Sequence, residues 1–316
     1  MLDLSTSDGL PPFRFSGHET FACRYAWLPK AYRAIQANSS IFFEEDAAMV
    51  ELGIGKNMVR SLRFWIDVMG VAKPGGQRNH ELTPTATAIF GDGGYDPYLE
   101  DVRTLWLLHW NVSSGAIPAL FAWHYLMGVW PYPEFTRSEM LGAFLRQSER
   151  LGYSHSSVTL GQHLDIFLHT YTSGRSARVG IEDSLDGPLV ELRLLQQTGE
   201  KRGDGGRWEP VYAFRREAKP DVTNELFAFS LLDYWNRTAP GEKTLLARQV
   251  ISAAGAPGQV FKLPEEDVRA RLEWLSRQDD LGISYRPSAI QGLLTRETSL
   301  SVSADFIYRD RIKTHG

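Results

Sequence analysis

The chain has 316 residues, which is long enough for two or three packed modules. Hydrophobic residues make up 43% of it and charged residues 23%, a balance that is typical of globular domains and excludes a largely disordered protein. The net charge of −4 also excludes a protein that coats nucleic acid through its overall charge. Any contact with DNA must therefore come from a local basic patch.

Cysteine usage and the lack of long apolar stretches bear on the cellular compartment. The sole cysteine, Cys23, excludes an internal disulfide and a zinc site built from cysteines. No stretch approaches the roughly 20 apolar residues that span a membrane, and no basic segment followed by an apolar run opens the sequence. We therefore expect a cytoplasmic protein with no membrane contact.

Periodicity and turn-forming residues divide the sequence into four predicted segments. Residues 1–110 are predicted to form an N-terminal winged helix-turn-helix domain, and residues 111–180 a helical middle domain. Residues 181–222 are predicted to form a β-hairpin insertion, and residues 223–316 a winged-helix-like C-terminal domain. The predicted fold class is thus mainly α, with tandem winged helix-turn-helix modules around a helical core and a β-hairpin insertion.

Two helices with a short break between them are predicted in residues 44–69. Gly53 and Gly55 flank Ile54, and a break of this length occurs in helix-turn-helix motifs. Gly53 also suits the left-handed backbone that ends a helix. At ~100° per residue, the second helix has one apolar face and one largely basic face. The apolar face holds Met58, Leu62, Trp65 and Met69, and the opposite face holds Lys56, Arg60, Arg63 and Asp67.

The basic face of this helix carries the residue types that recognition helices use. Arginine can bind guanine through two hydrogen bonds, asparagine can bind adenine, and lysine can contact phosphate. The glycine-rich, basic segment 71–83 then predicts a wing. The alternative is a helix whose basic face serves only solubility, because residues 44–83 hold more acids than bases. The predicted DNA-binding residues are Lys56, Asn57, Arg60, Arg63 and Arg78.

Helix-start signals mark the next elements. Pro84 opens a predicted helix, and residues 101–110 form an almost continuously apolar helix that must be buried. Thr136 and Glu139 have the spacing of a capping box and predict the start of another helix. A further helix is predicted over residues 159–171.

Strand signals follow in the third quarter of the sequence. Residues 189–197 and 207–215 are predicted strands, and the glycine-rich residues 199–206 are predicted to form the exposed turn of a hairpin.

The C-terminal part returns to helical periodicity. Helices are predicted over residues 224–237 and 244–254 and again from Pro264, followed by short strands near residues 282–286 and 290–295. This order of helices and a final hairpin predicts a second winged helix.

Long blocks of the sequence resemble a known family. The blocks are FSGHETFACRYAWLPKAY at 15–32, ELGIGKNMVRSLRFW at 51–65 and LTPTATAIFGDGGYDPYLEDVRTLWLLHW at 82–110, with later matches at 188–195 and 252–268. They resemble the SspB-type DNA nickase family of bacterial single-strand DNA phosphorothioation systems. The resemblance covers nearly the whole chain.

This resemblance implies a function in bacterial defence. It implies a DNA-binding endonuclease that nicks one strand of double-stranded DNA and so prepares a site for sulfur incorporation. It also implies partnership with the sulfur-transfer proteins and the ATPase of the same gene cluster, and the sequence leaves a homodimer open. We expect a divalent cofactor, Mg²⁺ or Mn²⁺, although no sequence motif shows the nicking activity or identifies metal ligands.

The best catalytic candidates lie in the SGHET motif and at the start of the apolar helix. His18 is a candidate base or metal ligand, Glu19 a candidate metal ligand, and Arg24 a candidate phosphate clamp. Glu100 and Asp101 are adjacent acids that could complete such a centre. The structural alternatives are that the motif caps a helix and satisfies buried amides, and that the two acids only complement a helix dipole.

Two non-catalytic interpretations stay open beside nicking. One is a DNA-binding adaptor or regulator that recruits the sulfur-transfer machinery, and the other is a scaffold that uses its winged helices for protein contacts. A nickase needs acids that converge near the basic helix, whereas an adaptor does not.

Overall fold

A computed structural model describes residues 13–115, 118–173, 187–203, 206–288 and 291–312. Helices dominate this part of the chain, and its strands are short. Buried apolar side chains from all of its segments form one continuous cluster. The predicted mainly α class is therefore confirmed. Of the helices within these ranges, none combines the length and apolar character that a bilayer crossing requires.

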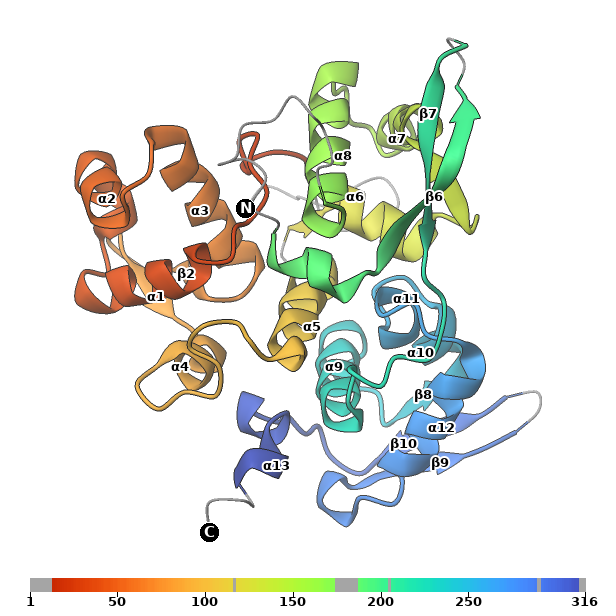
Figure 1. Cartoon of the computed structure of the whole chain (residues 1–316). Coiled ribbons are helices and arrows are strands. Elements are labelled where there is room, and N and C mark those ends of the chain that lie inside the picture. Colours follow the sequence, from red (N-terminus) through yellow and green to blue (C-terminus); the bar gives the residue numbers. More distant parts are fainter. Residues whose placement is uncertain (1–12, 116–117, 174–186, 204–205, 289–290, 313–316) are drawn as a thin grey trace.

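The N-terminal helices lie together on one side of the molecule (Figure 1). Gly53 has a φ of 64° at the C-terminal cap of α2, which confirms the predicted break and its left-handed glycine. The antiparallel strands β2 and β3 form a hairpin directly after α3. The elements here are α1 (Trp27–Ala37), a 3-10 turn (Ile41–Phe43), α2 (Glu45–Leu52), α3 (Lys56–Val68), β2 (Ala72–Pro74), β3 (His80–Leu82) and α4 (Pro84–Phe90).

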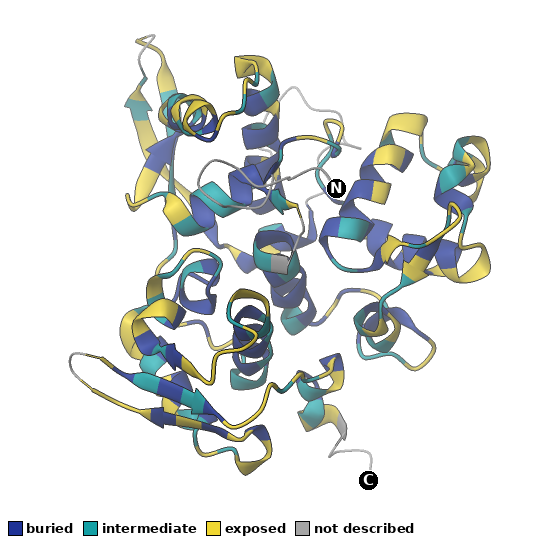
Figure 2. Cartoon of the chain, turned by 180° about the vertical axis from the view of Figure 1, so that it is seen from behind, coloured by how far each residue is buried: buried dark blue, intermediate teal, exposed yellow. Residues whose placement is uncertain are grey.

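Helix α5 (Val102–Trp110) lies between the N-terminal helices and the rest of the molecule (Figure 1). All of its side chains from Thr104 onward are buried, as its apolar sequence predicts (Figure 2). The helix continues as a π-helical turn (Asn111–Gly115). Strand β4 (Ala119–Leu120) then pairs in parallel with β1 (Phe13–Arg14), so the start of the described chain is anchored in its middle.

The middle of the chain combines helices with a three-stranded sheet. The capping box predicted from Thr136 and Glu139 is present at the start of α7. Strand β7 pairs with β6 on one side and with β5 on the other. The elements are α6 (Phe121–His124), a π-helical turn (Tyr125–Val129), β5 (Glu134–Thr136), α7 (Arg137–Arg150), α8 (Ser157–Tyr171), a 3-10 helix (Pro188–Leu192), β6 (Leu195–Arg202) and β7 (Trp208–Phe214).

Two details of the predicted hairpin were wrong. The first half of the predicted strand 189–197 lies in the 3-10 helix Pro188–Leu192, because Pro188 opens a helical turn that buries Leu189 and Leu192 together. Strand β6 then continues to Arg202, into residues predicted as a loop. The hairpin also shares its sheet with β5 of the middle segment. The boundary expected between residues 180 and 181 lies outside the described residues.

The C-terminal part ends in another small sheet. The helix predicted from residue 244 begins later, because residues 244–246 form a strand, β8, that pairs with β10. The elements are α9 (Asn224–Thr238), β8 (Thr244–Leu246), α10 (Ala247–Ser252), α11 (Pro257–Val260), α12 (Glu265–Leu275), a 3-10 turn (Asp279–Leu281), β9 (Ile283–Arg286), β10 (Leu293–Arg296), a 3-10 turn (Ala304–Phe306) and α13 (Arg309–Ile312). Residue 290, which was expected to begin the last strand, is not among the described residues.

The middle and C-terminal parts have the same sheet order. In each, one strand is followed by helices and then by two further strands, the second of which lies at the centre of the sheet. The orders are β5–β7–β6 and β8–β10–β9. The N-terminal part has the helices and the final hairpin but only two strands, β2 and β3.

Candidate nucleic-acid interface

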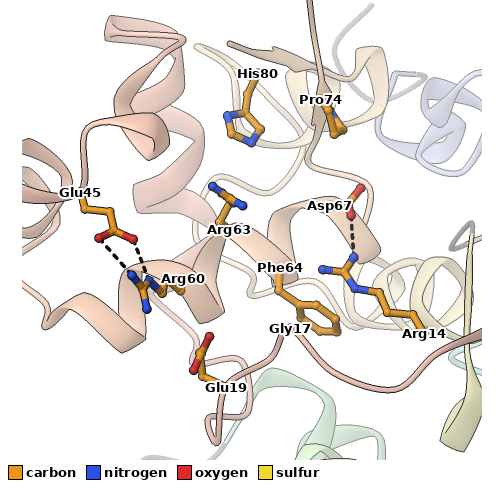
Figure 3. Close-up of a pocket in the computed structure, with 10 residues that line it drawn as sticks. All are labelled: Arg14, Gly17, Glu19, Glu45, Arg60, Arg63, Phe64, Asp67, Pro74 and His80. Carbon is orange, nitrogen blue, oxygen red and sulfur yellow. Dashed lines mark hydrogen bonds and ion pairs between the residues drawn. The ribbon is translucent and has the colours of Figure 1, made fainter. Parts of the chain in front are cut away.

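A pocket of about 300 Å³ lies against α3, between that helix, the segment that follows β1, and the hairpin β2–β3 (Figure 3). It gathers polar side chains that are far apart in the sequence. Its lining residues are Arg14, Gly17, Glu19, Glu45, Arg60, Arg63, Phe64, Asp67, Pro74 and His80.

Helix α3 presents its basic residues as the sequence predicts. Lys56, Asn57, Arg60 and Arg63 are all exposed, whereas Leu62 and Trp65 are fully buried. The buried face is wider than the helical pattern predicts. Ser61 Oγ and Trp65 Nε1 both donate to the carbonyl oxygen of Phe21, at 3.1 and 3.0 Å, and so fix the N-terminal segment against the helix.

Two of the predicted DNA-binding cations are held by an acid of α2. Glu45 forms ion pairs of 2.7 Å with both Lys56 and Arg60. Hydrogen bonds from Arg60 and then Lys56 lower the pKa of Glu45 to about 2. The basic face is thus partly neutralised within the protein, which the helical pattern alone did not predict.

Arg63 lies between two ion-paired groups. Figure 3 shows Glu45 and Arg60 on one side of it, and Arg14 and Asp67, 2.9 Å apart, on the other. Within the described part of the chain, the Arg63 guanidinium has no hydrogen bond or ion pair, and it lies 5.7 Å from the centre of the Phe43 ring. A guanidinium in this state can form two hydrogen bonds with an incoming anion.

Among the acids that line this pocket, Glu19 is the one with no cation partner in the part of the chain that the structure describes. Its backbone has a φ of 52°, a left-handed conformation that non-glycine residues rarely adopt. Its side chain is exposed and has no hydrogen bond or ion pair in the described structure. The pKa of Arg60 is raised first by its hydrogen bond to Glu45 and also by the charge of Glu19, so the Glu19 carboxylate acts on the basic face of α3.

A chain of hydrogen bonds through two histidines supports the Glu19 backbone. The backbone N–H of Ala122 donates to His163 Nε2 at 3.1 Å, so that nitrogen carries no proton. His163 Nδ1–H then donates to His18 Nε2 at 3.1 Å, and His18 Nδ1–H donates to the carbonyl oxygen of Glu19 at 2.9 Å. Both rings must therefore be neutral. Burial lowers the pKa of His18 and, more strongly, that of His163.

This arrangement separates the two neighbours in the SGHET motif. His18 is 3% exposed and faces the core, with both ring nitrogens occupied, whereas Glu19 lies on the pocket. His18 therefore positions the backbone and does not line the pocket. Arg24, the third predicted member, has its guanidinium 5.7 Å from the ring of Trp27 and is not part of the pocket lining.

The other predicted acids lie elsewhere, so the expected convergence with Glu19 was wrong. Asp101 caps α5, accepting from Arg103 N at 2.9 Å, and forms ion pairs with Arg103 and Arg311 at 2.8 and 2.6 Å. Burial alone would raise its pKa, but these cations lower it. Glu100 is exposed beside it and does not line the pocket. This placement matches the helix-dipole alternative.

The hairpin β2–β3 carries the predicted Arg78 and adds His80, which the sequence did not single out. Arg78, in the turn of the hairpin, donates to the carbonyl oxygen of Phe43 at 3.1 Å and lies 5.9 Å from its ring. His80 packs on the same ring, with centroids 5.0 Å apart, and its buried Nδ1 has no hydrogen-bond partner among the described residues. Burial and then the charge of Arg63 lower the pKa of His80, so its ring is neutral near pH 7.

The carboxylates around α3 differ in their availability to a metal ion. Glu45 and Asp67 form ion pairs with cations of the protein. Of the acids that line the pocket, Glu19 is therefore the one available to bind a metal ion. In the described ranges, no group of three or more His, Cys, Asp and Glu side chains has the geometry of a metal site. Mg²⁺ is commonly bound by one or two carboxylates together with substrate phosphates and water, and a single exposed glutamate fits that mode.

The fold and the pocket together define a class of mainly helical proteins in which small sheets follow helices and a basic helix borders a pocket with an available acid. Residues 15–307 match the family described as "Protein of unknown function (DUF4007)", and the chain belongs to that family.

Two solved structures are similar to this chain. They are described as "Magnesium ion-bound SspB crystal structure" and "SspB crystal structure", with TM-scores of 0.76 and 0.75. In both comparisons the sequence identity is 26%, and the match covers 95% of this chain and 86% of the other. The predicted resemblance to the SspB-type family is therefore confirmed. No curated protein matches the sequence.

Proposed function

We propose that this protein is the DNA-acting component of a bacterial phosphorothioation system and that it nicks one strand of double-stranded DNA. The observation that carries the proposal is the pocket on α3, where Arg63 and Glu19, neither of which has an ion pair among the described residues, lie beside the same basic helix. The similarity to SspB supports the biological setting.

We further propose that α1, α2, α3 and the hairpin β2–β3 act as a winged helix-turn-helix. Lys56 and Asn57 are exposed at the start of α3, where recognition helices contact base edges. Arg78 is exposed in the turn of the hairpin, where a wing contacts the DNA backbone. The pocket then lies between these two contacts and would receive a phosphate.

The chemistry assigned to the pocket is charge stabilisation at that phosphate. Arg63 would bind its oxygens and stabilise the negative charge that develops during cleavage. Glu19 would hold a divalent ion. The magnesium named for one similar SspB structure supports the choice of a divalent ion. Such an ion supplies positive charge at the phosphate and an acidified water. The His18–His163 pair would keep the Glu19 backbone in position for this role.

The proposal is tested by nicking of supercoiled plasmid with Mg²⁺ or Mn²⁺ by the wild type, Glu19→Gln and Arg63→Ala. We expect Glu19→Gln to abolish nicking while duplex binding and the melting temperature stay near wild type. Arg63→Ala should reduce nicking by about 100-fold or more, as loss of a charge-stabilising donor does elsewhere. The matched control is Arg33→Ala, which removes an exposed arginine of α1 outside the pocket. Full nicking by Glu19→Gln would contradict the assignment.

The cation pairing of Glu45 and Asp67 favours a second candidate function. With one available acid, the pocket would bind a DNA phosphate without cutting it, and the protein would act as an adaptor for the sulfur-transfer proteins and the ATPase. Purified protein that binds duplex DNA but leaves plasmid intact with either metal, alone and as a homodimer, would support the adaptor.

A further inference from the structure

The hairpin β6–β7 extends beyond the sheet to which it belongs (Figure 1). Strand β5 pairs only with residues 211–213 of β7, so the outer rungs of the hairpin have no third strand. The side chains along this outer part are largely exposed (Figure 2). This outer part is stabilised by its own cross-strand pairs and by contacts with α7, and its exposed side chains are available to a ligand.

An exposed tryptophan lies near the tip of this hairpin. Trp208 is 63% exposed and is the cross-strand partner of Arg202, whose guanidinium lies 5.7 Å from the centre of the ring. Arg207, the preceding residue, is also exposed. Neither arginine has an ion pair among the described residues. An exposed aromatic ring with one cation beside it and a second on the neighbouring residue matches a base with its phosphates.

The neighbouring charges of the hairpin are already used within the protein. Lys201 forms an ion pair of 2.6 Å with Glu139 of α7. Glu209 accepts a hydrogen bond of 3.0 Å from Ser138 N at the start of the same helix. These contacts hold the hairpin against α7 and leave Arg202 and Arg207 for an external anion. Glu200, exposed and two residues before Arg202, would weaken that binding.

We propose that Arg202, Arg207 and Trp208 form a second nucleic-acid site, which binds unpaired nucleotides. A base stacks on the ring of Trp208, and the two guanidinium groups contact the adjoining phosphates. Stacking on an open ring requires a base that has left its partner, because the bases of a duplex cover each other's faces. This site lies outside the α3 pocket and uses neither Arg63 nor Glu19. At a nick, it would hold the strand end that frays.

The test measures binding of the full chain to a fluorescent single-stranded oligonucleotide and to a duplex of the same length. Trp208→Ala should weaken single-strand binding by about tenfold, whereas Trp208→Phe should retain most of it. Arg202→Ala with Arg207→Ala should also weaken it and should flatten its salt dependence. Glu200→Gln should strengthen it. Melting temperatures of all variants check that the fold is intact.

A second exposed aromatic–arginine pair supplies the matched control. Tyr98 is 64% exposed and lies 5.7 Å from the guanidinium of Arg33, so Tyr98→Ala removes a comparable pair elsewhere on the surface. Equal losses for Tyr98→Ala and Trp208→Ala would overturn the assignment, as would unchanged binding by Trp208→Ala. Equal weakening of duplex and single-strand binding would overturn the specificity for unpaired nucleotides. Arg63→Ala should leave single-strand binding intact. The proposal for this site and the proposal for the α3 pocket can therefore be contradicted separately.

Discussion

At the scale of single residues, the two neutral histidines link the core to the pocket. Each ring has one donor and one acceptor, and the direction of the chain is set by the N–H of Ala122. A proton added to either ring would place two donors face to face, 3.1 Å apart, in a buried site. The sequence shows the two residues 145 positions apart, and no local pattern indicates that they meet.

A pH-dependent stability follows from these lowered pKa values. Because the folded protein binds protons at His18 and His163 less readily than the unfolded chain, the stabilisation is fully present above about pH 6.5 and is lost as the pH falls below it. His109, whose pKa burial lowers to about 3, adds to the same slope. The melting temperature should therefore drop between pH 7.5 and 5.5.

His163→Gln isolates the contribution of the pair. We expect this variant to melt at a lower temperature at pH 7.5 but with a shallower decline toward pH 5.5, since the histidine pair no longer contributes while His80 and His109, whose pKa values burial also lowers, are left unchanged. A decline as steep as that of the wild type would show that the histidine pair does not titrate on unfolding.

At the scale of secondary-structure elements, the sequence predicts what depends on neighbours along the chain. The glycine break after α2, the exposed basic face of α3 and the capping box of α7 were all predicted, because each depends on residues within a few turns. The ion pairs of Glu45 were not predicted, because they depend on how α2 packs against α3. The strand β8 was missed because its pairing partner is β10, far along the chain.

Gly53 offers a test of the break between α2 and α3. Its φ of 64° disfavours any side chain, while no atom lies within 4 Å of an added Cβ, so Gly53→Ala isolates the backbone cost. We expect a loss of about 1 kcal/mol in the free energy of unfolding, measured by urea denaturation. Gly55→Ala is the matched control, because Gly55 has an ordinary φ of −71° and equally open surroundings. Equal losses for the two variants would contradict the left-handed turn.

At the scale of the whole molecule, the pocket is an assembly of distant segments. Its residues come from β1 and the segment that follows it, from α2 and α3 and from the hairpin β2–β3, so Arg14 and His80 could not be recognised as site residues from their sequence context. The C-terminal helix α13 closes the fold on the far end of α5, where Arg311 and Asp310 pair with Asp101 and Arg103. Asp101 is thus held by cations at this end of α5, and neither Glu100 nor Asp101 lines the pocket.

Net charge and local pairing together predict the salt dependence of duplex binding. The molecule carries a net charge of −4, and two cations of α3 already have an acidic partner. With the four predicted cations Lys56, Arg60, Arg63 and Arg78 able to reach phosphates, log K should fall with log salt at a slope no steeper than about −4. Fluorescence anisotropy at increasing NaCl measures this slope. A slope near −10 for a monomer would reveal a much larger basic surface.

The histidine chain also has a consequence for the order in which the protein matures. Ribosomes deliver the SGHET motif early, but the carbonyl of Glu19 is supported through His18 by a ring that arrives with α8. The partner of that ring, the N–H of Ala122, is also delivered late. During synthesis, the residues of α1 to α3 are therefore complete before the carbonyl of Glu19 gains the hydrogen-bonded support that it has in the finished protein.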